Sequence, residues 1–204
     1  MMLDWDGCLN ARDVGGLPSS AGTRIRFGAL LRSDSHSRLT PAGIAAVRAV
    51  AASRILDLRW LAETAREPSP FTDDPAYRNT PLITELAEQG TTMPDAYRSM
   101  LDDNQRQITD VFIQMGAAPP GPLALHCSAG RDRTGVLVAL ALSVADVPTA
   151  SIAADYALTD GCSGHTILRM LTHLDDHHAG VHAYLLKGGA SHTQLRQVRN
   201  RLLA

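Results

Sequence analysis

The sequence predicts an α/β fold with a central, mainly parallel sheet flanked by helices. Short apolar runs of strand length alternate with longer segments in which apolar residues recur at helical spacing. The 204 residues contain no internal repeat and no convincing linker. One domain is therefore expected over residues 1–204.

The first half of the chain begins with loops and short strands. Residues 10–34 mix turn residues with short apolar pieces. Thr40 followed by Pro41 is a typical helix start, and helical spacing continues to about Ala52. A short strand and a weaker one are expected next, at residues 54–59 and 77–82.

The second half is dominated by helices. A long helix is expected from Met93 to Met115, and the sequence APPG at 118–121 ends it. A short strand at Pro122–His126 follows. The remaining helices are expected at about 133–145, 148–158, 164–174 and 191–203.

Composition excludes several classes of protein. Hydrophobic residues make up 45% of the chain and charged residues 20%, which argues against disorder. The net charge of −2 argues against a nucleic-acid partner. Cys8, Cys127 and Cys162 form no close pair, so neither a disulfide framework nor a CxxC zinc site is expected.

Neither a signal peptide nor a membrane anchor is expected. The first residues, MMLDWDGCLNARD, are acidic and polar where a signal peptide would be basic and then apolar. No apolar stretch is long enough for stable membrane insertion. We therefore expect a cytoplasmic monomer, with secretion that needs no cleaved signal left open.

The segment LALHCSAGRDRTG, residues 123–135, carries the chemistry. A strand, a loop of small residues and a helix form an oxyanion site, because loop amides and the first helical turn supply N–H donors. Ser128, Ala129 and Gly130 let the backbone approach a ligand closely. These donors and the neighbouring arginines favour the thiolate of Cys127, which is a strong nucleophile.

The residues after the small ones complete a phosphate site. Arg133 has a planar fork that suits two phosphate oxygens, and Arg131 adds positive charge. Thr134 can donate its hydroxyl to the sulfur when it leaves phosphorus, and His126 can hold the loop through backbone hydrogen bonds. The expected reaction forms a phosphocysteine, which water then hydrolyses without a cofactor.

This segment resembles the HC-x5-R-[ST] signature of cysteine-dependent protein tyrosine phosphatases, in the form found in bacterial enzymes of the atypical tyrosine and dual-specificity kind. NARDVGG at 10–16, LLRSD at 30–34, ILDLRWLAE at 55–63 and ADYALTD at 154–160 are similar to family segments in family order. The resemblance implies the α/β phosphatase fold and hydrolysis of phosphotyrosine, with dual specificity left open.

The proton donor to the leaving oxygen is less well defined. Asp132 is the first choice because its place in the loop is set by sequence. In relatives an acidic residue between positions 81 and 93 helps catalysis, and here Glu85 is the nearest one. Asp95, Asp102 and Asp103 are further alternatives. The family usually has lysine at the position of Arg131, so charge is kept but geometry changes.

Several other charged residues are expected to have structural roles. Arg59 and Glu63 are spaced for an i,i+4 pair, and Asp57 is expected to hold a loop. Contact of these three residues with the pocket, which the family resemblance implies, stays open as the alternative. Arg12 and Asp13 are expected to hold a turn rather than bind substrate.

The polar end of a late helix is expected to be solvated and to bind no metal. It carries His173, Asp175, Asp176, His177 and His178, without a partner set by a motif elsewhere in the chain.

Three other functions stay open at this point. A phosphoinositide phosphatase would use the same site, with Arg131 binding a multiply charged headgroup. A rhodanese-like sulfurtransferase also uses a loop cysteine, although the HC-x5-R-T pattern disfavours it. A phosphate-binding module without turnover would not need Cys127.

Overall fold

The computed structural model describes residues 1–20, 22–84 and 93–203. In this part of the chain the sheet has five strands in the order β1-β2-β5-β3-β4. β1 is antiparallel to β2, and every other neighbouring pair is parallel. The strands are β1 (Arg12–Asp13), β2 (Leu30–Ser33), β3 (Arg54–Asp57), β4 (Tyr77–Asn79) and β5 (Leu123–His126). The predicted α/β class with a mainly parallel sheet is confirmed.

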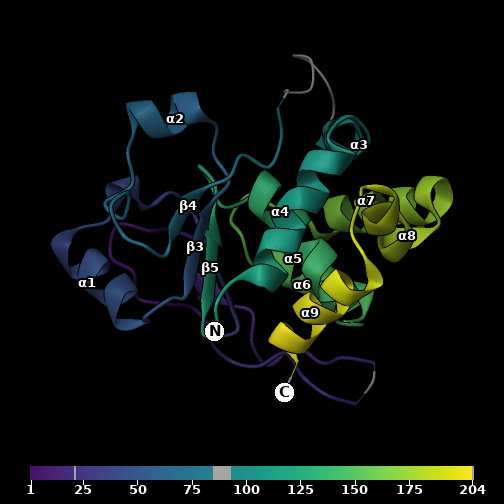
Figure 1. The fold of residues 1–204 in the computed structure, drawn as a ribbon, viewed down its shortest axis with the longest axis horizontal. Coiled ribbons are helices and arrows are strands. Elements are labelled where there is room, and N and C mark those ends of the chain that lie inside the picture. Colours follow the sequence, from purple (N-terminus) through teal and green to yellow (C-terminus); the bar gives the residue numbers. More distant parts are fainter. Residues whose placement is uncertain (21, 85–92, 204) are drawn as a thin grey trace.

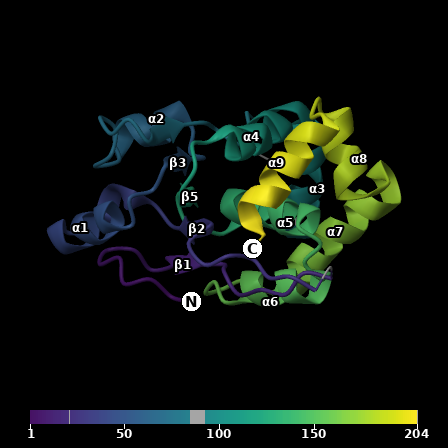
Figure 2. The same cartoon turned by 60° about the horizontal axis from the view of Figure 1, so that its bottom comes forward.

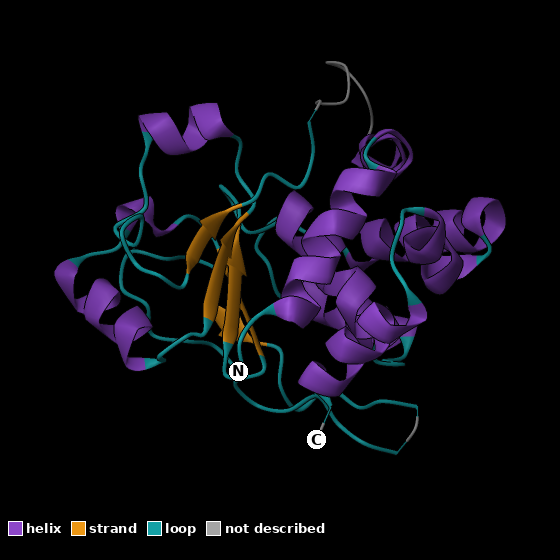
Figure 3. Ribbon diagram, viewed as in Figure 1, coloured by secondary structure: helices purple, strands orange, loops and turns teal. Residues whose placement is uncertain are grey.

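Helices cover both faces of this sheet (Figures 1 and 2). On one face lie α1 (Pro41–Ala49) and α2 (Leu61–Arg66), and the short 3-10 helix His36–Arg38 precedes them in the chain. The other face carries a thicker helical layer, which is plain in Figure 3. That layer consists of α3 (Met93–Asp103), α4 (Gln105–Ala117), α5 (Asp132–Val144), α6 (Thr149–Ala157), α7 (Gly164–His178), α8 (Gly180–Lys187) and α9 (His192–Leu202).

The central strand β5 divides the core into two clusters. Its side chains alternate between the two faces of the sheet. Leu123 and Leu125 pack in the larger cluster with α5, whereas Ala124 packs in the smaller one with Trp5 and Phe71. α5 is apolar on all sides, as expected for a helix buried within the helical layer. It is therefore a rigid support for the loop that precedes it.

The predicted helix over Met93–Met115 is wrong as a single element. It is broken at Asn104, which separates α3 from α4. The Asn104 side chain accepts from the backbone N–H of Thr84 at 2.8 Å and donates to Met100 O at 3.1 Å. This contact with a distant segment holds the chain out of the helix, and the apolar periodicity continues on both sides of it.

Other boundaries agree with the predictions to within a few residues, with three exceptions. α7 continues to His178 instead of ending near Leu174, and neither α2 nor α8 was predicted from the sequence. α8 is short, and left-handed backbone at Ala179 (φ +56°) and Gly180 (φ +90°) separates it from α7. Among the described residues, no helix combines the length and the apolar character that crossing a membrane requires.

Candidate active site

The loop between β5 and α5 holds the predicted nucleophile. Cys127 follows β5 directly and is only 2% exposed. Ser128 and Ala129 are exposed, whereas Gly130 is buried and has a φ of +67°. A Cβ atom at position 130 would lie 2.6 Å from the carbonyl oxygen of Ser33. Both the backbone angle and the lack of space therefore require glycine at this point.

The carbonyl groups of the loop are tied to the N-terminal part of the chain. The N–H of Ser35 donates to Ser128 O at 2.9 Å. Asn10 Nδ2 and Arg32 Nη2 donate to Gly130 O at 3.0 and 2.8 Å. In a trans peptide the C=O and the next N–H point in opposite directions. The amide groups that follow these carbonyls therefore point away from the anchors, as a cradle for an anion requires.

A buried ion cluster supports these anchors. Arg12 Nε and Arg32 Nη1 each lie 3.0 Å from a carboxylate oxygen of Asp155 on α6, and all three side chains are at most 5% exposed. Arg12 Nη2 also donates to Thr159 Oγ1 at 3.1 Å. Burial and the neighbouring Arg12 lower the pKa of Arg32. The cluster fixes the arginine that holds Gly130.

The prediction that Arg12 and Asp13 hold a turn applies to one of them. Asp13 accepts from the N–H groups of Gly15 at 2.8 Å and Gly28 at 2.7 Å, so it holds the turn. Arg12 instead points into the buried cluster with Asp155. Its partner lies 143 residues away in sequence, which local spacing cannot show.

Arg133 returns from the first turn of α5 and is held by α2. Its Nη1 and Nη2 donate to the two carboxylate oxygens of Glu63 at 2.5 and 2.8 Å. Its guanidinium also lies 5.1 Å from the ring centroid of Trp60. Hydrogen bonding from Arg133 and from the Trp60 backbone lowers the pKa of Glu63. The Nε edge of the fork has no protein partner among the described residues and is free for phosphate oxygens.

The predicted pair of Arg59 and Glu63 is therefore wrong. Arg59 turns the other way and binds Asp57, with Nη2 to Oδ2 at 2.6 Å. Tyr77 donates to the same oxygen at 2.8 Å. Burial raises the pKa of Asp57, but His126 and Arg59 together lower it by more, so the net pKa lies below its ordinary value. Asp57 thus holds the loop after β3. Glu63 is a residue of the site, where it binds Arg133, although its spacing in the sequence had favoured Arg59 as its partner.

His126 and Thr134 lie on either side of the loop. His126 is fully buried, its Nδ1 lies 3.2 Å from Cys127 O, and burial lowers the pKa of its imidazole. The N–H of Leu58 donates to His126 O at 2.8 Å, which joins the loop to β3. The hydroxyl of Thr134 is buried without a hydrogen-bond partner among the described residues. An unpaired buried hydroxyl is costly, so a ligand or the sulfur is its natural partner.

Asp132 is the first residue of α5 and is held by a tyrosine that sequence analysis missed. Tyr97, on α3, donates to Asp132 Oδ1 at 2.7 Å, and its hydroxyl lies 2.6 Å from that of Tyr156. Burial and the carboxylate raise the pKa of Tyr97. The sequence places Tyr97 on an apolar helix face, and only the folded structure, which brings Tyr97 to the first residue of α5, reveals its polar contact. Arg131 is exposed, with Nε 4.0 Å from Asp132 Oδ2.

The other predicted acids differ in position. Glu85 lies outside the described residues. Asp95 pairs with Arg98, and Asp102 contacts two histidines of α7. Of the other cysteines, Cys8 donates weakly to Ser35 O at 3.9 Å. Burial and Asp34 raise the pKa of Cys8 to about 12, so it remains a thiol.

The comparisons with known proteins agree with this geometry. Residues 3–168 match a model of the tyrosine phosphatase family. The chain is 33% identical over 152 residues to a tyrosine-protein phosphatase of Nostoc commune. This alignment covers 70% of this chain and 52% of that protein. The chain is 32% identical over 187 residues to the triple specificity protein phosphatase PtpB of Mycobacterium tuberculosis, covering 74% and 66%. The chain thus spans about half to two thirds of the length of these relatives. It belongs to the tyrosine phosphatase family.

Proposed function

We propose that the protein hydrolyses phosphotyrosine in proteins through a phosphocysteine intermediate. The observation that carries this proposal is the loop after β5, in which Cys127 precedes amides turned away from their anchors and Arg133 presents a free Nε edge. Ser128, Ala129, Gly130, Arg131, Asp132 and Arg133 supply the backbone donors. Preorganised donors of this kind stabilise the charge that develops on transferred phosphate.

In the first step the thiolate of Cys127 attacks phosphorus in line with the leaving oxygen. A sulfur–phosphorus bond forms and the phosphorus–oxygen bond to tyrosine breaks. Asp132 gives its proton to the leaving oxygen, and we assign the proton to Oδ2 because Oδ1 accepts from Tyr97. Arg133 binds two phosphate oxygens throughout, in the orientation set by Glu63.

In the second step water hydrolyses the phosphocysteine. Asp132, now ionised, takes a proton from the attacking water, and the sulfur–phosphorus bond breaks. The departing thiolate accepts a hydrogen bond from Thr134, whose hydroxyl is buried without another partner among the described residues. His126 keeps the Cys127 carbonyl in place through both steps. No metal or other cofactor is needed for this reaction.

The indole ring of Trp60, beside the site, favours a substrate whose phosphate is attached to a phenyl ring. Trp60 lies against Arg133, and its Nε1 donates to Ile83 O at 2.6 Å, so the indole has a fixed orientation. Fixed aromatic faces pack well against another ring. The relatives are named tyrosine and triple specificity phosphatases, which supports activity on phosphotyrosine and leaves phosphoserine and phosphothreonine as further substrates.

The first test compares kcat/KM on a phosphotyrosine peptide, a phosphothreonine peptide and phosphatidylinositol phosphates, with Cys127→Ser as the blank. We expect the highest value on phosphotyrosine and a burst of dephosphorylated peptide. Undiminished phosphate release by Cys127→Ser would refute the mechanism. Higher rates on the lipids, lowered selectively by Arg131→Ala, would identify a phosphoinositide phosphatase. Thiosulfate–cyanide activity without phosphatase activity would identify a sulfurtransferase.

The second test concerns the proton donor. Asp132→Asn should lower kcat more for an alkyl phosphate than for p-nitrophenyl phosphate, because nitrophenolate leaves without a proton. Equal losses on both substrates would exclude Asp132 and make Glu85 the next candidate for the acid, ahead of Asp95, Asp102 and Asp103. The proposed monomeric state is tested by light scattering, and the proposed cytoplasmic location by fractionation of cells.

A further inference from the structure

A carboxylate of α3 meets two imidazoles at the C-terminal end of α7. Asp102 Oδ1 lies 3.0 Å from Nε2 of His173 and 2.8 Å from Nε2 of His178. The three possible ligand atoms all lie within 4.8 Å of one another. The sequence predicts no metal at this end of α7. The ligand that the sequence does not connect with these histidines is Asp102, which lies 71 residues before His173 in the chain.

The donor set and its spacing fit a transition metal of the zinc class. Zinc binds imidazole nitrogen and carboxylate oxygen at about 2.0–2.1 Å in a tetrahedron, which places neighbouring ligand atoms about 3.3 Å apart. Two of the three separations here are a few tenths of an ångström shorter than that. Two nitrogen ligands disfavour calcium and magnesium, which prefer oxygen. Three protein ligands also leave one coordination position for water.

The site is accessible and its ligands are partly fixed by packing. Asp102 is 43% exposed, whereas the side chains of His173 and His178 are 8% and 12% exposed. The ring of His177 stacks on that of His173 at 4.5 Å between centroids, and Tyr184 packs edge-on against His178. Rings held in this way lose little freedom when an ion binds.

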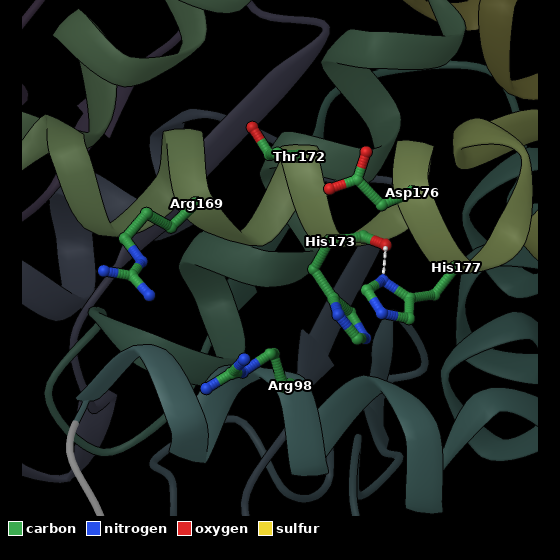
Figure 4. Close-up of a pocket in the computed structure, with 6 residues that line it drawn as sticks. All are labelled: Arg98, Arg169, Thr172, His173, Asp176 and His177. Atoms are coloured by element: carbon green, nitrogen blue, oxygen red, sulfur yellow. Dashed lines mark hydrogen bonds between the residues drawn. The ribbon is translucent and has the colours of Figure 1, made fainter.

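A cavity of about 300 Å³ opens beside the ring of His173 (Figure 4). In the close-up the rings of His173 and His177 lie next to each other, and Arg98 extends from α3 with its guanidinium directed away from these rings. Of the three proposed ligands, His173 lines this cavity. The remaining residues that line it are Arg169, Thr172 and Asp176.

We propose that Asp102, His173 and His178 bind one zinc ion, or an ion of the same class, and so link α3 to α7. Each imidazole ligates through Nε2 and carries its proton on Nδ1. The ion replaces the hydrogen bonds between the two imidazoles and Asp102 with coordinate bonds, as the Nε2 proton of each ring gives way to one on Nδ1. The same helix carries Tyr97, whose hydroxyl holds Asp132, so the ion also restrains that tyrosine. This proposal does not depend on the proposed phosphatase activity.

The test measures zinc binding in the Cys127→Ser background, because a thiolate would itself bind zinc. Protein freed of metal with a chelator is titrated with zinc against a chromophoric competitor. The triad variants are Asp102→Asn and His178→Gln, and the matched control is His165→Gln, an exposed histidine at the other end of α7. Circular dichroism in chelator verifies that each variant is folded.

We expect one zinc per chain in the background protein and in His165→Gln, and an affinity about tenfold or more lower in both triad variants. Zinc at a hundred times its Kd should raise Tm by roughly 5–10 °C, again except in the triad variants. Cobalt should give the visible absorption of a four-coordinate site.

Two results would overturn the proposal. One is zinc affinity in both triad variants equal to that of His165→Gln, which places the ion elsewhere. The other is the absence of stoichiometric binding in the background protein. If His178→Gln does not fold, Asp102→Asn and the cobalt spectrum of the background protein decide.

Discussion

Replacing Glu63 with glutamine should slow catalysis, although Glu63 does not touch the expected position of the phosphate. Its carboxylate holds the Nη1 and Nη2 edge of Arg133 at 2.5 and 2.8 Å, and the two side chains are only 18% and 12% exposed. Glutamine keeps the hydrogen bond to the N–H of Trp60 and so preserves the start of α2. The substitution therefore removes charge without removing the helix cap.

The size of the effect follows from the bonds that are lost. A hydrogen bond between charged groups contributes about 1.5–3 kcal/mol, and glutamine retains part of it as a single neutral contact. A loss of about 1–2 kcal/mol in transition-state stabilisation corresponds to a decrease of roughly 5- to 30-fold in kcat/KM. The effect should be present at neutral pH, because Arg133 lowers the pKa of Glu63 below its ordinary value of 4.5. It should disappear as pH falls through that lowered pKa.

The assay is kcat/KM on p-nitrophenyl phosphate and on a phosphotyrosine peptide. Glu67→Gln is the matched control, because Glu67 follows the same helix and is half exposed beside Arg66. Exposed pairs of this kind contribute little. Equal kcat/KM in the two variants would refute an orienting role for Glu63. An increase in Glu63→Gln would mean that the carboxylate competes with phosphate for Arg133.

Two further predictions concern stability. Asp155→Asn should lower the free energy of unfolding by about 3–5 kcal/mol in urea, because it leaves Arg12 and Arg32 buried without a counter-charge. Asp146→Asn, at a partly exposed pair with Arg199, should cost less than about 1 kcal/mol. Equal losses in the two variants would refute the argument. Burial lowers the pKa of His36 well below 6.5, so below that pH the unfolded chain binds more protons than the folded one. Stability should therefore fall there by up to about 1.4 kcal/mol for each pH unit. In urea unfolding between pH 5 and 7.5, the slope of stability against pH should be smaller for His36→Phe, and an unchanged slope would contradict the assignment.

Local patterns were sufficient to predict most of the fold. The apolar run of β5, the small residues of its loop and the apolar segment of α5 are contiguous, so strand, loop and helix could be placed from the sequence. The break at Asn104 could not be predicted, because it depends on a hydrogen bond to Thr84. Helical periodicity describes each residue relative to its neighbours, and it contains no information about such a distant partner.

The same distinction applies to the site. Cys127 and Arg133 belong to one short segment, and their spacing alone points to phosphate chemistry. Glu63 and Tyr97 approach that segment from α2 and α3, and each had a plausible local explanation in the sequence. Spacing of i,i+4 favoured Arg59 as the partner of Glu63, whereas Asp57 binds Arg59 through its carboxylate and leaves Glu63 free.

Strand order explains why these distant residues meet at the loop. β5 lies between β2 and β3, and all three run parallel, so their carboxyl ends are at the same edge of the sheet. The segment after β2 donates to Ser128 O, and the segment after β3 donates to His126 O. Each flanking strand thus fixes one end of the loop. Ligands of parallel sheets bind at this edge for the same topological reason.

A cradle for phosphate has to keep several amide N–H groups unsatisfied until the ligand arrives, which disfavours the folded loop. Ion pairs and hydrogen bonds outside the cradle compensate for this loss of stability. Arg32 spans both parts, because one nitrogen binds Asp155 and another holds Gly130 O. Loss of Asp155 should therefore lower kcat/KM as well as stability. Fixing the loop carbonyls, with Gly130 O held by the buried Arg32, keeps the amides oriented before substrate binds. This preorganisation is what a developing phosphoryl charge requires.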